Sequence, residues 1–146
     1  MLVRAELPPS VFWTPFLFKN HSPVRWFVVG QHGGAVVVVR TGPRSIDVLR
    51  EGGPLMPCGP EDVVNTKGIP AGAVVEFPGL RATILSTEGN ECPSHVAFDL
   101  DRDLDAGTVL WVVEGPGGFQ HVTPPGVGVG VRLAPRRPQR WGPCPG

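Results

Sequence analysis

The stretches Val24-Arg25-Trp26-Phe27-Val28-Val29-Gly30 and Ala35-Val36-Val37-Val38-Val39-Arg40 decide the fold class of this chain. β-Branched and aromatic side chains favour extended strands, and a four-residue loop with two glycines, 31–34, separates the two runs. This arrangement predicts a β-hairpin. The second run is apolar at consecutive positions, so we expect both of its faces to be covered, either inside a β-sandwich or at an oligomer interface.

The rest of the chain continues as short apolar runs between turn residues. Its 20 Gly and 18 Pro interrupt the 146 residues often, and its 22 Val outnumber the 11 Leu and three Ile. Further strands are predicted at 45–50, 74–77, 80–87, 95–101, 109–114, 119–123 and 127–133. Many short strands at this spacing predict an all-β fold, an antiparallel β-sandwich with a small β-barrel as the alternative.

The same pattern divides the chain into three parts. Residues 1–20 form an aromatic N-terminal arm, 21–134 a single β-rich domain, and 135–146 a poorly ordered tail of Pro and Arg. At most one short helical turn is expected, near 60–67, where a proline precedes two acids. The arm either covers its own core or docks on a partner. The candidate interaction residues are Phe12, Trp13, Phe16, Phe18 and Trp26.

Charge excludes some classes of partner. Thirteen basic and thirteen acidic residues give no net charge, which argues against electrostatic capture of nucleic acid. Eleven of the basic residues are Arg, as a GC-rich genome would produce. Neither a signal peptide nor a membrane-spanning run is recognisable, so we expect a soluble cytoplasmic protein. Peripheral membrane contact through the aromatic arm remains a third alternative.

Alternating acids are the most conspicuous polar feature. Asp99, Asp101 and Asp103, followed by Asp105, place carboxylates at every second position, and hard cations such as Ca²⁺ take several oxygen ligands. The EF-hand pattern fails, because Leu104 stands where its glycine is required. The other interpretation is that the acids line the solvent side of a strand and the turn after it.

Cys92 and His95 have the Cys-x-x-His spacing of a zinc-chelating pair. Cys58 and Cys144 offer two further ligands, although neither belongs to a second close-spaced pair. Each of the three cysteines adjoins a proline, which equally suits exposed thiols or one disulfide. An odd number of cysteines argues against a secreted disulfide framework.

The sequence carries no nucleophile elbow, dinucleotide-binding fingerprint or Walker loop. We therefore expect a non-enzymatic binding or assembly module that acts through apolar contacts with a protein partner or with further copies of itself. The alternative is a small β-fold enzyme or divalent-cation-binding protein using Asp99, Asp101 and His95. No cofactor is expected, with Ca²⁺ or Zn²⁺ as the exceptions that these residues would allow.

Overall fold

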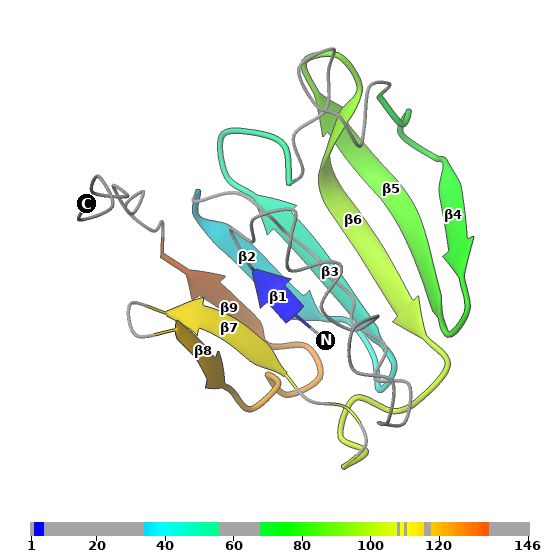
Figure 1. The fold of residues 1–146 in the computed structure, drawn as a ribbon. Coiled ribbons are helices and arrows are strands. Elements are labelled where there is room, and N and C mark those ends of the chain that lie inside the picture. The colour runs from blue at the N-terminus through cyan, green and yellow to red at the C-terminus, as the bar shows by residue number, and fades with distance from the viewer. Residues whose placement is uncertain are drawn as a thin grey trace, which may run out of the picture.

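The structure, a computed structural model, describes residues 2–4, 34–55, 68–107, 109, 111–115 and 118–134. Within these ranges the secondary structure is entirely β and forms two sheets (Figure 1). The six-stranded sheet is antiparallel, in the order β4-β5-β6-β3-β2-β9, and the three-stranded sheet has the order β1-β7-β8, with β1 parallel to β7. The large sheet comprises β2 (Val36–Arg40), β3 (Ser45–Arg50), β4 (Val74–Phe77), β5 (Leu80–Glu88), β6 (Cys92–Leu100) and β9 (Gly130–Leu133). The small sheet comprises β1 (Leu2–Arg4), β7 (Val112–Gly115) and β8 (Gly118–His121).

The all-β prediction is confirmed. The large sheet has β4 at one end and β9 at the other and does not close on itself, so the β-barrel alternative is wrong. Whether the two sheets form a complete sandwich stays a prediction. The helical turn expected near 60–67 and the tail at 135–146 lie outside the described residues.

One strand pairing differs from the prediction. β2 has β3 on one side and β9 on the other, both antiparallel, so neither of its edges is available to the hairpin partner expected at 24–30. Those residues themselves lie outside the described ranges. The glycine loop at 31–34 was compatible with a hairpin to the preceding run. However, the turn at 41–44 is equally short, and β2 forms its hairpin with β3 through that turn.

Side-chain alternation gives the large sheet two different faces. On β3, Ile46 and Val48 are fully buried, whereas Asp47 between them is half-buried on the other face. β6 follows the same rule, with Val96 and Phe98 buried. We call the buried face the inner face and the opposite one the outer face. The inner face carries the core, because successive residues of a strand point to opposite sides.

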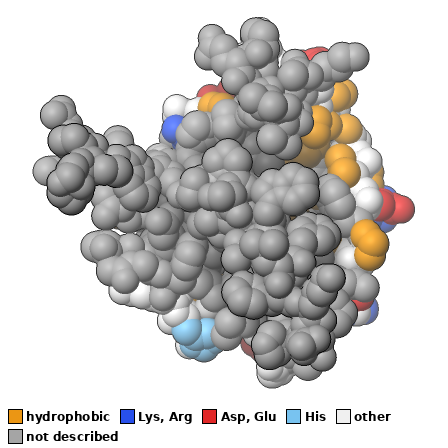
Figure 2. Space-filling model, viewed as in Figure 1, with side chains coloured by type: hydrophobic (Ala, Val, Ile, Leu, Met, Phe, Trp, Pro, Cys, Tyr) orange, Lys and Arg blue, Asp and Glu red, His pale blue; other side chains and the backbone are white. Residues whose placement is uncertain are grey.

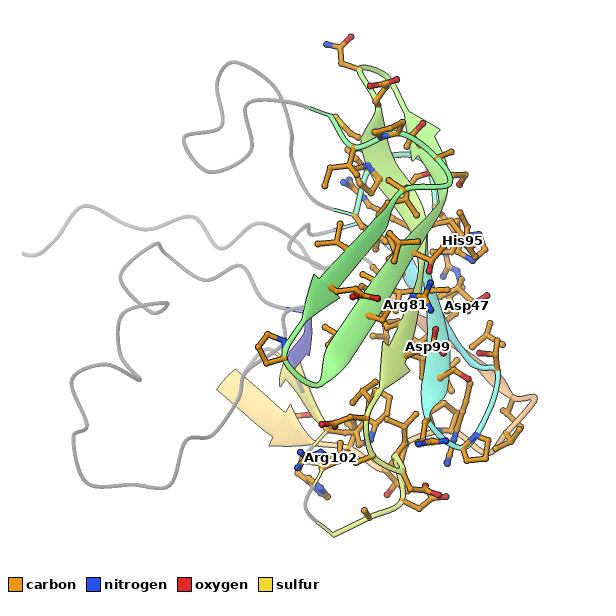
Figure 3. All side chains as sticks on the ribbon, turned by 90° about the vertical axis from the view of Figure 1, so that its right-hand side faces the viewer. Asp47, Arg81, His95, Asp99 and Arg102 are labelled. Atoms are coloured by element: carbon orange, nitrogen blue, oxygen red, sulfur yellow. The ribbon has the colours of Figure 1, made fainter. Side chains whose placement is uncertain are left out.

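Trp111 joins the small sheet to this core. It directly precedes β7, is almost fully buried, and belongs to the same apolar cluster as the inner face. Its indole Nε1 donates to the carbonyl oxygen of Leu104 at 3.4 Å, and its own carbonyl accepts from the amide of Val122 at 3.0 Å. The small sheet accordingly lies on one side of the large sheet, while Asp47 and His95 point to the other (Figure 3).

A glycine fixes how the chain enters β4. Gly68 precedes Ile69, whose amide donates to the carbonyl of Glu91 at 2.8 Å and whose side chain packs against the core. A Cβ at Gly68 would stand 2.6 Å from the Cβ of Glu91 and 2.8 Å from its carbonyl oxygen, and also against the carbonyl of Asn90. Backbone atoms cannot move aside as the end of a long side chain can, so this contact requires glycine.

We expect Gly68→Ala to lower the free energy of unfolding by about 1–3 kcal/mol, the usual cost of forcing extra volume into a packed site. Urea denaturation measures the change. Gly107→Ala is the matched control, since a Cβ at Gly107 meets no heavy atom within 4 Å. Equal stabilities of the two variants would contradict this close approach.

Candidate functional site

The outer face of the large sheet holds His95 and Asp99, two of the polar residues that the sequence singled out. Strand register places them in rows across the sheet. In one row Glu76 of β4, Arg81 of β5, Asp99 of β6 and Ser45 of β3 are successive cross-strand neighbours. This row pairs charges of opposite sign between adjacent strands, an arrangement that stabilises antiparallel sheets modestly.

An open depression of about 310 Å³ lies at the end of this row, beside the β4–β5 turn. It is lined by Glu76, Gly79, Leu80, Arg81, Asp99, Leu100 and Asp101. Two of its acids already face a cation: Glu76 lies 3.8 Å from Arg81, and Asp101 lies 3.0 Å from Arg102. These pairs are solvent-exposed, so water screens them and each contributes little to stability. The depression can therefore receive a small polar group but does not enclose one.

Asp47 and His95 form a second polar pair on the same face. The Nε2 atom of His95 lies 3.5 Å from Oδ2 of Asp47, and both side chains are half-buried (Figure 3). A carboxylate beside an imidazole is the usual arrangement for orienting a general base. Neither residue lines the depression, however, and a general base acts only on a substrate held within hydrogen-bonding reach. The pair by itself is a polar contact between β3 and β6.

Two of the candidate metal ligands, His95 and Asp99, are held apart because they lie on the same extended strand. His95 and Asp99 are four residues apart on β6, which places their Cα atoms about 13 Å apart at ~3.3 Å per residue. One ion cannot be reached from both positions. In the part of the chain that the structure describes, no three His, Cys, Asp or Glu side chains come close enough to hold a metal ion. The cation hypothesis therefore stays a prediction, without support from this geometry.

Cys92 is buried at the start of β6 and is disulfide-bonded. A disulfide sulfur is not the thiolate that zinc requires, so in this oxidised form Cys92 does not complete the predicted Cys-x-x-His pair. Cys58 and Cys144 lie outside the described residues. Disulfides persist mainly in oxidising compartments, so this bond and the cytoplasmic expectation point to different compartments.

The later acids of the alternating run bind an arginine. Arg40, at the end of β2, is buried, and its two terminal nitrogens each donate to one carboxylate oxygen of Asp105 at 2.8 Å. Asp103 lies 3.6 Å from the same guanidinium and accepts the amide of Asp105 at 2.9 Å. The remaining donors of Arg40 reach the carbonyls of Gly42, Pro43 and Pro125 at 3.1–3.3 Å. We call this set of contacts the Arg40 clamp.

The clamp explains Asp103 and Asp105 without a metal. The hydrogen bonds from Arg40 lower the pKa of the Asp105 carboxyl below its ordinary value, and those same bonds raise the pKa of Arg40 against the opposing effect of its burial. The burial of Arg40 had a signal in the sequence, because Arg40 continues the inward alternation of Val36 and Val38. The predicted aromatic contact residues at 12, 13, 16, 18 and 26 lie outside the described ranges, so the structure does not test them.

Comparisons with protein-family models, curated proteins and solved structures found no significant match to this chain. The described ranges contain no helix that is long and apolar enough to cross a membrane.

We expect the stability conferred by the clamp to depend on pH. The folded state lowers the pKa of Asp105, so this stabilisation is complete above the pKa of an unfolded aspartate, near 4, and is lost as the pH falls through the lower folded value. Asp105→Asn should therefore be clearly less stable than the wild type at about pH 7 and should approach it towards about pH 2. Thermal denaturation across this range measures the difference.

Asp101→Asn is the matched control, because Asp101 pairs with the exposed Arg102 and leaves the buried arginine untouched. A stability difference between Asp105→Asn and the wild type that stays constant with pH would contradict the clamp as the source of the effect.

Proposed function

We propose that this protein is a non-enzymatic binding or assembly module whose contact surface is the outer face of the large sheet. The main support for this proposal is that β2 is apolar on both faces, whereas only one of them is buried in the core. Val36 and Val38 are inside the core, whereas Val37 and Val39 stay partly exposed on the outer face. Strands with consecutive apolar residues normally have both faces covered, which supports a partner on the outer side.

The composition of the outer face supports the same proposal. Its exposed large apolar residues include Leu49 of β3, Val74 of β4 and Leu85 of β5. Charged pairs lie around them: Glu76 with Arg81 at one margin, and Glu51 with Arg132 at the other. Figure 2 is seen from the side of the small sheet, so it shows only the margin formed by β4 and β5, where hydrophobic side chains lie beside a few charged ones. Protein interfaces commonly combine apolar side chains with polar and charged ones, as this face does around the Asp47–His95 pair.

The enzyme or cation-binding alternative has less support. It requires Asp99, Asp101 and His95 to act on one ligand, but His95 is separated from Asp99 by four residues of extended strand. The depression that contains Asp99 and Asp101 is open to solvent, and Asp101 is paired with Arg102. Catalytic sites are usually enclosed enough to exclude water and orient the substrate.

Site-specific photo-crosslinking in the native cells tests the proposal. A benzophenone amino acid at Leu49, in the middle of the outer face, should give a cross-linked product of one discrete mass, because a partner that covers this face must contact position 49. The same amino acid at Arg102 is the control, since Arg102 is also exposed but lies in the loop after β6. Western blotting against the protein detects both.

The proposal is contradicted if Leu49 yields no discrete product, or if Leu49 and Arg102 yield the same products. The Leu49 variant must keep the thermal stability of the wild type for this comparison. We expect that it does, because the side chain at 49 points away from the core.

A further inference from the structure

The edge strand β9 presents an apolar strip to solvent. Among the described strands it pairs with β2 on one side and with none on the other. Val127 and Val129, just before the strand, are 55% and 50% exposed, and Val131 within it is 41% exposed. Proteins usually protect a sheet edge with charges, because its unpaired backbone groups can bind another strand.

The one charged residue of β9 does not protect the edge in this way. Arg132 points to the outer face, where it is the cross-strand neighbour of Val37. Its guanidinium donates to both carboxylate oxygens of Glu51, at 2.7–3.1 Å, so its charge is already neutralised within the chain. The strand thus combines free backbone groups, exposed valines and a paired charge.

We propose that β9 pairs antiparallel with β9 of a second copy of this chain, about a two-fold axis at Val131. This inference goes beyond the proposed function, because the edge of β9 is a surface separate from the outer face. The backbone supports the register. Val129 accepts a hydrogen bond from Arg40, so alternation turns the backbone groups of Val131 towards β2 and those of Gly130 and Arg132 towards the free edge. An axis at Val131 places Gly130 opposite Arg132 of the second copy. The backbone N–H and C=O groups of these two residues then face each other across the two strands.

The side chains are self-complementary in the same register. Directly opposed residues of an antiparallel pair share one face. On the inner face Val131 meets Val131 of the second copy, and Val129 meets Leu133. On the outer face Gly130, which has no side chain, stands opposite Arg132 and leaves room for the Arg132–Glu51 pair. Apolar groups meet apolar groups, and no charge is buried unpaired.

Charge also permits a second copy as the partner. The chain has no net charge at pH 7, so two copies approach without overall repulsion. A four-residue strand contributes less than the roughly 800 Å² per partner of a standard interface. The dimer should therefore be reversible and should depend on protein concentration.

Sedimentation equilibrium of the purified full-length chain, from about 5 to about 500 µM, is the first test. We expect the wild type to pass from 15.6 kDa towards twice that mass. Val131→Lys should raise the dissociation constant at least tenfold, because it places two like charges opposite each other at the axis. Ala71→Lys is the matched control: Ala71 is exposed in the turn before β4, the other edge strand of the same sheet, and its substitution should leave the constant unchanged.

A cysteine at the axis tests the register. Opposed residues of a non-hydrogen-bonded pair have Cα atoms about 4.5 Å apart, within the range of a disulfide. Val131→Cys should therefore form a covalent dimer under mild oxidation. Ala71→Cys and the wild type, which share the native cysteines, should not.

Three results would overturn the inference: a wild type that stays monomeric throughout, a dimer that Val131→Lys and Ala71→Lys weaken equally, or a dimer in which Val131→Cys does not cross-link. A monomer that still gives the Leu49 cross-link to another protein would overturn the β9 dimer and leave the proposed function intact. A β9 dimer without any Leu49 cross-link would retain this inference and reject the outer face as the contact surface.

Discussion

The buried guanidinium of Arg40 is the interaction on which the arrangement of the large sheet depends. A charge removed from water costs several kcal/mol unless it is paired and hydrogen-bonded, so the loops that supply its partners must lie where they do. Asp105 comes from the connection after β6, and Pro125 from the segment before β9. The backbone of Arg40 also bonds directly to Gly128 and Val129. The clamp thereby holds β9 against β2, and no other described strand pairs with the far edge of β9.

A sheet that buries one face has consequences for function. The inner face and Trp111 account for the core, and the outer face is left with aliphatic and paired charged side chains. Binding by such a surface depends on the area covered and on the fit of its rim, rather than on a deep pocket. The open depression beside Asp99 agrees with this reading, since its acids face nearby arginines. The outer face and the edge of β9 are separate surfaces, and the proposed experiments separate them.

Much of the fold could be predicted, and little of the surface arrangement. The bounds of β3 and β4 match the prediction, and Val96, Phe98 and Leu100 of β6 point inward as expected. The pairing of β2 was wrong, because a short glycine loop permits a hairpin but does not compel one. The strand predicted at 127–133 begins at Gly130, and Val127 and Val129 before it are exposed. Asp47 and Arg81 were not predicted as site residues, because each acquires its polar partner only on a neighbouring strand. The partner of Asp47 is His95, and the cross-strand neighbour of Arg81 is Asp99.

The sequence by itself determined what depends on neighbours along the chain. Alternation of side chains, β-branched runs and turn residues act over a few positions, so they specified an all-β fold, most strands and the faces of β3 and β6. Only the tertiary structure decided what depends on strand order. Arg40 and Asp105 are 65 positions apart, and nothing local in the sequence shows that the two will meet, so the acids after Asp99 suggested a metal where an arginine stands. The physical reason is that side-chain period is a local property, whereas pairing partners and sheet edges result from burying one shared core.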